Sequence, residues 1–393
     1  MPDEQARINH ILTKQVFGLA ITELTSLLSR RSVYCSKKAD GKYSICTAFT
    51  KADGNIKLPK AKHNWSKAGK CESCGANQDE YDRDETAESY AYPFIHGIDP
   101  TKVFKVKFDV IIGNPPYQLS DGGHGRSSSP IYHRFVQQAK KLEPRYLAMV
   151  IPARWFAGGK GLSEFRQSML TDNRLRAMHD FLSASDIFSG IGLKGGVCYF
   201  LWDRDSPGAC QVTTHFKDWP VSSASRPLLE KGVDVFIRFN EAISILKKVA
   251  AVEIVESKSH SLPESKRFDR LVSSRKPFAL TTTFKGKPTK RAGDVLVYQN
   301  GGTGYTPKSS ITTGTELIDK WKIYVGRAAP GTGNKDTYPH KIISTPFIGE
   351  PESVSSETYL CIGPFDSRGE SESALSYLSC QFTRFLILSL IHI

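Results

Sequence analysis

The sequence lacks any long hydrophobic run. No apolar stretch approaches the ~18 residues that a transmembrane helix requires, and the apolar segment "FLILSLIHI" at residues 385–393 is much shorter. The opening residues "MPDEQARINH" contain no apolar core of a secretion signal. These absences predict an intracellular protein with no membrane partner.

Acidic residues are also scarce relative to basic ones. The chain has 40 Asp and Glu against 53 Lys and Arg, which gives a formal net charge of +13. A surplus of this size favours a polyanionic partner such as nucleic acid, although a generic basic protein would show it too. The eight cysteines are more typical of free thiols or metal ligands than of disulfides in an intracellular chain.

The pattern along the 393 residues divides them into three parts. Residues 1–32 and 93–205 alternate apolar runs with helical patterns, which is typical of an α/β sheet with helices on both faces. Residues 33–92 are polar and indicate a small inserted module. Residues 206–393 contain short mixed strands and glycine turns, which predict a second domain of the α+β type.

Within these parts the local patterns predict individual elements. Strands are expected at residues 16–21, 92–96, 108–113, 146–152, 175–182 and 195–203. Helices are expected at residues 132–142 and 162–170, and another at residues 234–250 opens the second domain.

The strand at residues 108–113 ends in an unusual loop. "FDVIIG" is followed by Asn114, Pro115, Pro116 and Tyr117. Ligands of open α/β sheets bind at the carboxyl ends of strands, and two prolines hold this loop rigid. The Asn114 amide and the Pro115 carbonyl then become fixed acceptors beside the flat face of Tyr117. An ordinary turn is the alternative, but the position after a buried strand favours a site.

Two fixed acceptors beside an aromatic ring suit the exocyclic amine of adenine. The lone pair of N6 is delocalised into the ring, and hydrogen bonds to two oxygens favour a tetrahedral, nucleophilic nitrogen. This requires preorganised acceptors rather than a strong base. Stacking on Tyr117 would contribute ~1–3 kcal/mol, and a base inside a duplex must first be flipped out.

The segment "FDVIIGNPPY" resembles the catalytic motif of amino-methyltransferases that act on DNA adenine, most closely the gamma class of restriction–modification systems. Residues 146–156, 162–181 and 188–205 resemble later sheet motifs of that family. The resemblance implies a Rossmann-like methyltransferase sheet, S-adenosylmethionine as methyl donor and double-stranded DNA as substrate. It also implies a target-recognition domain at residues 206–393 and a cytoplasmic location in a bacterial or archaeal cell.

The same resemblance assigns roles within the loop. In the family, the Asn and the first Pro position hold the target amine and the Tyr stacks on the base, roles that carry over to Asn114, Pro115 and Tyr117. Pro116 shapes the loop. An N4-cytosine enzyme could use the same chemistry, but this motif in this order is more similar to the adenine type.

The cofactor motifs of the family are matched only in part. "VFGLAITEL" at residues 16–24 resembles the second-strand segment, with Gly18, Ile21 and Glu23 as cofactor contacts, although Ala20 stands where the family commonly has an acidic residue. Asp99 matches an acidic residue that approaches the cofactor adenine, or simply belongs to an Asp-Pro turn.

The glycine-rich cofactor loop of the family is not found. None of the fifteen residues before Val16 is a glycine, and a strand, turn and helix need about 30 residues. We therefore expect the downstream part of a longer methyltransferase, shortened at its other end as well, with a divergent loop as the alternative. A partner chain would supply the missing loop, and a nuclease partner stays open.

The polar insertion contains four cysteines, Cys35, Cys46, Cys71 and Cys74. Asp40-Gly41 is a hairpin signal that sets the first two opposite each other, and "CESCG" supplies a second pair. Two pairs fit a structural zinc site with four thiolates, and a metal would help a polar module to fold. His63 could replace one cysteine. Four free thiols, or a disulfide between the first two cysteines, are the alternatives.

Basic residues near aromatic residues or glycine turns are the expected DNA contacts, since cations neutralise phosphates. They are Arg126, Lys285, Lys287, Lys322 and Arg327. The last two lie in "DKWKIYVGRAAPGTG" at residues 319–333, which resembles recognition-domain segments of the family. A solvated loop face is the alternative for the basic residues of 258–291.

Two functional hypotheses follow. The first is a site-specific DNA adenine N6-methyltransferase, or a subunit or fragment of one, in a restriction–modification system. The second is a catalytically inactive DNA-binding fragment or specificity partner that lacks the cofactor loop. Binding of S-adenosylmethionine separates the two.

Overall fold

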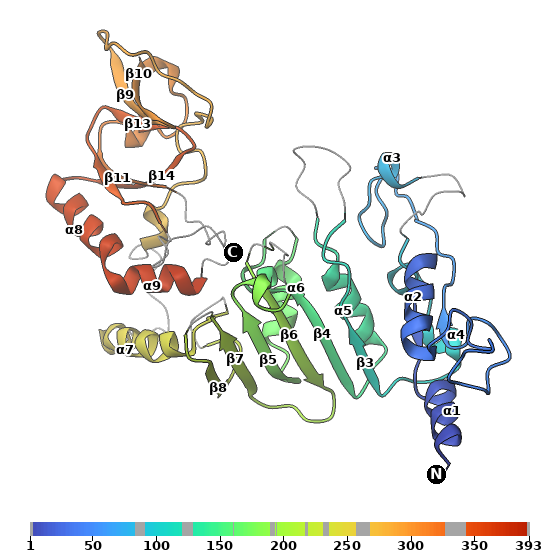
Figure 1. Cartoon of the computed structure of the whole chain (residues 1–393). Coiled ribbons are helices and arrows are strands. Elements are labelled where there is room, and N and C mark those ends of the chain that lie inside the picture. Colours follow the sequence, from blue (N-terminus) through green and yellow to red (C-terminus); the bar gives the residue numbers. More distant parts are fainter. Residues whose placement is uncertain are drawn as a thin grey trace.

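Figure 1 shows the computed structural model of the chain. The residues that it describes are 3–82, 91–119, 129–159, 161–188, 193, 195–216, 219–230, 236–256, 268–326 and 343–390. Among these residues, no helix has the length and apolar character needed to cross a membrane.

The centre of the molecule is a six-stranded mixed sheet. Its strands run in the order β3 (Val110–Gly113), β4 (Tyr146–Pro152), β6 (Val197–Asp203), β5 (Leu175–Phe181), β7 (Cys210–His215) and β8 (Ser222–Arg226). β3 and β4 are parallel, as are β5 and β7, whereas β6 lies antiparallel to β4 and β5, and β8 lies antiparallel to β7. The predicted α/β class is confirmed, and four of the predicted strands are present within one or two residues of their predicted ends.

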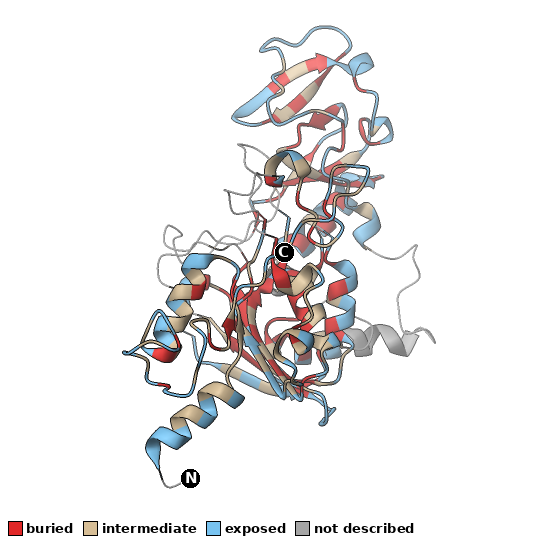
Figure 2. Ribbon diagram, turned by 90° about the vertical axis from the view of Figure 1, so that its right-hand side faces the viewer, coloured by how far each residue is buried: buried red, intermediate tan, exposed pale blue. Residues whose placement is uncertain are grey.

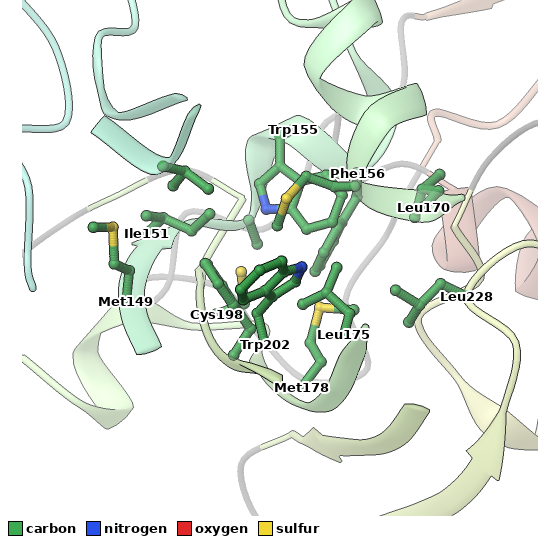
Figure 3. Close-up of a cluster of buried hydrophobic side chains, with 14 of the residues drawn as sticks. Met149, Ile151, Trp155, Phe156, Leu170, Leu175, Met178, Cys198, Trp202 and Leu228 are labelled. Carbon is green, nitrogen blue, oxygen red and sulfur yellow. The ribbon is translucent and has the colours of Figure 1, made fainter. Parts of the chain in front are cut away.

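One face of this sheet is covered by helices. α5 (Tyr132–Lys141), η2 (Ala153–Ala157) and α6 (Ser163–Leu170) contribute to the same hydrophobic core as Leu147, Met149 and Ile151 of β4. Figure 3 shows how Trp155 and Trp202 lie in this core. Buried residues gather in the sheet and its helices (Figure 2). Two of the predicted helices, at residues 132–142 and 162–170, are therefore confirmed.

The opposite face carries exposed apolar side chains. Ile112 and Val110 of β3 are 78% and 54% exposed, and Tyr199 and Leu201 of β6 are 38% and 36% exposed. We expected helices on both faces, but within the described residues helices cover one face. The expectation was wrong on this point because alternating apolar residues indicate which side chains could be buried, not which partner covers them.

A glycine lets β6 begin close to β5. Gly196 has a φ of +80°, and a Cβ at this position would lie 2.0 Å from the carbonyl oxygen of Phe181. No L side chain fits there, so the "GG" before the apolar run is required by the close approach of the two strands.

The segment before the central sheet differs from the expectation. α1 (Glu4–Lys14) was not predicted, and the expected strand at 16–21 is reduced to β1 (Gly18–Leu19). β1 pairs in parallel with β2 (Ile56–Lys57) in a separate two-stranded sheet, and α2 (Glu23–Tyr34) follows. The expected strand at 92–96 is the 3₁₀ helix η1 (Pro93–Ile95), because Pro93 fixes a helical φ at its start. Two short helices, α3 (Gln78–Tyr81) and α4 (Pro100–Phe104), complete this region.

The remaining residues form smaller sheets and helices. One sheet has the order β10 (Gly302–Pro307), β9 (Asp294–Gln299) and β13 (Ser353–Ser355), and another the order β12 (Phe347–Gly349), β11 (Trp321–Gly326) and β14 (Tyr359–Phe365). The helices are α7 (Asn240–Glu256), α8 (Arg368–Ser379) and α9 (Gln381–Leu390). α7 begins six residues later than the predicted helix at 234–250. The central sheet also continues past residue 205 through β7 and β8, so the proposed domain boundary falls inside it.

Candidate active site

The loop at the carboxyl end of β3 presents the predicted catalytic residues. Asn114 is exposed, Pro115 is buried, and Tyr117 is half-buried. Two backbone hydrogen bonds join the end of this loop to the segment that precedes α5. The N–H of Ile131 donates to Tyr117 O at 3.2 Å, and that of Leu119 donates to Ser129 O at 3.0 Å. The buried proline and these bonds hold the loop in place while the Asn114 amide faces solvent.

The side chains of Asn114 and Tyr117 lie beside each other. Burial raises the pKa of Tyr117, and a hydrogen bond from the Asn114 side chain opposes this shift. The Tyr117 hydroxyl is buried and has no well-aligned hydrogen-bond partner among the described residues, so the two side chains are neighbours with a poorly aligned contact. The hydroxyl is anchored by packing, and the amide of Asn114 stays free to bind another group.

The predicted cofactor residues lie near the entrance to β3. Gly18 is in β1, and the preceding Phe17 packs its ring 5.2 Å from that of Phe104 and 5.9 Å from that of Phe108. Ile21 and Glu23 are exposed at the start of α2.

Asp99 has a different partner from the one expected for cofactor binding. Its side chain caps α4, accepting hydrogen bonds from the backbone N–H of Thr101 at 2.9 Å and the Thr101 hydroxyl at 2.7 Å. These bonds hold the pKa of Asp99 below its usual value. The turn alternative therefore describes the observed role of this carboxylate.

The predicted zinc ligands are separated by the fold. Cys71 and Cys74 lie together with His63 and His96, and one ligand atom from each residue lies within 4.8 Å of the others. Cys35 and Cys46 are not part of this cluster. The expected hairpin around Asp40-Gly41 is absent because α2 extends to Tyr34 and residues 35–50 form turns without strands. The prediction of four thiolates is corrected to two thiols and two imidazoles.

The candidate DNA contacts differ in their exposure. Lys285 and Lys287 are exposed beside the β9–β10 hairpin, and the Lys285 ammonium donates to the carbonyl of Asn300. Arg126 and Arg327 lie outside the described residues. These four remain predictions.

Lys322 cannot contact DNA in this fold. It is fully buried, and its ammonium group donates to three carbonyls, Ile318 O at 2.9 Å, Lys320 O at 2.8 Å and Glu350 O at 3.1 Å. Burial lowers its pKa to about 8. The prediction was wrong because β11 is the central strand of its sheet and is buried on both faces, so apolar and basic residues there do not alternate between core and solvent.

Sequence reasoning missed one member of the Cys/His cluster. His96 follows the segment that we expected to be a strand, and it comes close to Cys71 only because η1 turns the chain. No spacing rule links residue 96 to residues 71 and 74. His63, by contrast, was recognised as an alternative ligand.

Comparisons with known proteins agree with the resemblance read from the motif. Residues 14–188 match the model of the Eco57I restriction-modification methylase family. The chain is also 36% identical over 255 residues to an uncharacterized adenine-specific methylase of Mycoplasma pneumoniae, a match that spans 58% of this chain and 60% of that protein. The predicted resemblance to adenine-specific methylases of restriction–modification systems is thereby confirmed.

Two solved structures are distant structural neighbours. The type IIL restriction-modification enzyme MmeI, solved in complex with DNA, has a TM-score of 0.43 and 11% identity, covering 90% of this chain and 50% of that chain. The type I restriction-modification methyltransferase subunit from Streptococcus thermophilus has a TM-score of 0.26 and 13% identity, covering 65% and 51%. Both scores are low, so the assignment depends on the family match and the relative.

Proposed function

We propose that this chain carries the catalytic loop of a DNA methyltransferase that transfers a methyl group to N6 of a flipped adenine. The observation that carries this proposal is the loop at the carboxyl end of β3, where an exposed Asn114 amide adjoins Tyr117. The match to an adenine-specific methylase over 255 residues supports the choice of adenine. The non-catalytic alternative is not favoured by these comparisons.

The roles of the loop residues follow from their positions. The Asn114 side-chain oxygen and the Pro115 carbonyl would accept hydrogen bonds from the adenine amine and favour charge developing on N6. Tyr117 would stack on the base, since its ring is only half-buried. Pro116 would restrict the loop. Neither acceptor has to gain or lose a proton to play this role.

The methyl donor in this proposal is S-adenosylmethionine, which supplies an electrophilic methyl group when bound. The described residues fit only part of such a site. Glu23 offers an exposed carboxylate at the start of α2, near Gly18 and Ile21, whereas an oxygen of Asp99 is already engaged with Thr101. We infer that further cofactor contacts come from a segment outside this chain.

The exposed apolar residues at the edge of the central sheet support the proposal of such a segment. β3 pairs with β4 and is an edge strand among the described residues, and its own Ile112 is 78% exposed. Leu24 and Leu28 of α2 are 65% and 56% exposed as well. Parallel strands are normally buried on both faces, so a strand and helix carrying a glycine-rich turn would cover these apolar groups.

DNA binding is proposed for the exposed cations. Lys285 and Lys287 project from the surface of a chain with a net charge of +13, and phosphate contacts by such side chains are strongly salt-dependent. Arg126 and Arg327 stay candidates for the same role.

Methyl transfer tests the proposal. The chain is co-expressed with a polypeptide that carries a glycine-rich cofactor loop, and radiolabelled methyl transfer to adenine-containing DNA is measured together with calorimetric binding of S-adenosylmethionine. Asn114→Ala should lower the transfer rate by about 10²- to 10³-fold without loss of cofactor binding. Gln211→Ala, which removes an exposed amide in β7, is the control and should leave transfer unchanged. Adenine methylation that survives Asn114→Ala would refute the assignment.

A further inference from the structure

Four side chains outside the strand-end loop converge on one point. Cys71 Sγ lies 3.5 Å from His96 Nε2, and Cys74 Sγ lies 3.5 Å from His63 Nδ1. Zinc bonds of ~2.3 Å to sulfur and ~2.0–2.1 Å to nitrogen, at the tetrahedral angle, place the two ligand atoms about 3.6 Å apart. Both measured separations agree with this tetrahedral edge.

We propose that His63, Cys71, Cys74 and His96 bind one structural zinc ion. The donor set supports zinc, because two thiolates and two imidazoles are its usual ligands in closed, tetrahedral sites. Both cysteines are buried and neither forms a disulfide. This inference concerns the fold and does not depend on methyl transfer.

The orientation of His96 is fixed by a second interaction. Its Nδ1 lies 2.8 Å from the carbonyl oxygen of Tyr92, and a carbonyl can only accept, so Nδ1 carries the proton. The Nε2 lone pair then points towards Cys71. A backbone carbonyl holding the far nitrogen of a ligating histidine is a recurrent feature of metal sites.

The "CESCG" turn brings the two sulfur atoms to the same side of the chain. The N–H of Gly75 donates to Cys71 O at 2.7 Å, and Gly75 itself has a φ of +79°, a conformation that favours glycine. The N–H of Ala76 donates to Cys74 Sγ at 3.4 Å. The turn is thus shaped before any metal binds.

The proposed zinc centre would connect the polar segment to the catalytic loop. Cys71 and Cys74 pack in one hydrophobic cluster with Leu119 and Ile131, the residues whose backbone N–H groups fasten the strand-end loop. Arg134 of α5 donates to Ser73 O at 2.5 Å, between the two cysteines. Zinc would stabilise this junction because the polar segment buries few apolar groups of its own.

X-ray absorption of the purified full chain tests the ligand set without any substitution. We expect one zinc per chain, coordinated by two sulfur and two nitrogen atoms. After chelation, Co²⁺ should restore a tetrahedral absorption spectrum with thiolate charge-transfer bands. A spectrum of four sulfur ligands would overturn the proposal, as would a chain that contains no metal and takes up no Co²⁺.

Substitutions within the same polar segment provide a matched comparison. Cys71→Ser and His96→Gln should each lose the metal, whereas Cys35→Ser and Cys46→Ser should keep one zinc per chain. Loss of zinc from either control, with retention in Cys71→Ser, would contradict the assignment. If Cys71→Ser fails to fold, the absorption spectrum of the unsubstituted chain still decides the question.

Discussion

At the scale of single residues, the side chain of Tyr117 combines a partly exposed ring with a buried hydroxyl that lacks a partner among the described residues. Tyr117→Phe removes the hydroxyl, whose burial costs desolvation free energy because no hydrogen bond compensates for it. We therefore expect unchanged or slightly higher stability and retained methyl transfer, because the ring face remains. Thermal unfolding and the transfer assay measure the two effects.

Tyr117→Ala is the contrasting substitution. It removes the ring and should weaken capture of the flipped base by the ~1–3 kcal/mol of one stacking interaction, which would appear as a loss of DNA affinity for substrates in which the target base is unpaired. Equal effects of the Phe and Ala substitutions would contradict a stacking role.

Lys322 should contribute a pH-dependent term to stability. Its pKa of about 8 in the folded state lies below the usual lysine value of 10.5. Between these pH values the unfolded chain binds more protons than the folded chain, so the stability contributed by this residue rises with pH, by at most about 1.4 kcal/mol per pH unit. Urea unfolding of the unsubstituted chain and of Lys322→Met at several pH values measures the difference between them. A difference that falls as the pH rises above 8 would contradict this sign.

The residue scale also shows what sequence patterns can reveal. Asn114 and Tyr117 were predicted because a short motif at a strand end carries its own chemistry. Lys322 was misplaced because a charged side chain in a strand is assumed to face solvent. In the structure its ammonium group is buried and donates hydrogen bonds to three backbone carbonyls. The Cys/His cluster was predicted except for His96, since "CESCG" is a local signal whereas the approach of His96 depends on the tertiary fold.

At the scale of elements, one carboxylate links α5 and β6 to the turn that precedes β5. Asp172 is almost fully buried and accepts hydrogen bonds from Lys140 Nζ at 2.9 Å, Arg174 Nε at 2.7 Å and Trp202 Nε1 at 2.9 Å. The two cations and the indole N–H hold the pKa of Asp172 well below its usual value, although burial alone would raise it. This residue therefore fixes the end of α5 to the sheet.

Asp172→Asn tests this junction with little change of volume. It leaves Lys140 and Arg174 without their anionic partner and should reduce the free energy of unfolding by about 2–3 kcal/mol. Because the folded pKa is depressed, the stabilisation is present above the unfolded value near 3.9 and is lost as the pH falls. The gap in unfolding free energy between the two proteins should therefore stay constant from pH 7 to about pH 5 and narrow progressively as the pH falls below about 4, towards the depressed folded pKa. A gap that does not narrow below about pH 4 would contradict an ionised Asp172.

Elements with strong local patterns were predictable, and elements that depend on pairing were not. β4 matches its predicted range, because "YLAMVIP" alternates between the core and the opposite face. The strand expected at residues 16–21 is short because its partner is β2 of the polar segment rather than the central sheet. The sequence contained no signal for that pairing.

At the scale of the whole molecule, one face of the central sheet carries apolar side chains that no other described residue covers. Ile112 pairs with Ala148, which pairs with Leu201, so the exposed side chains of β3 and β6 share one face of the sheet. An exposed apolar face beside an open strand edge is a site for association. A completing segment would cover it, and the chain alone should be prone to self-association.

Ile112→Lys tests the completing segment. A lysine at the centre of the proposed interface would need to bury its charge, so co-purification with the co-expressed polypeptide that carries the cofactor loop and the gain of S-adenosylmethionine binding should both be lost. The isolated chain should keep its stability and become less prone to aggregate, because Ile112 is 78% exposed. Gln211→Lys, which adds the same charge at an exposed position of β7, should leave complex formation intact. Size-exclusion chromatography with light scattering measures both outcomes. Unimpaired complex formation by Ile112→Lys would mean that the open edge of β3 is not where the cofactor-binding segment joins the sheet.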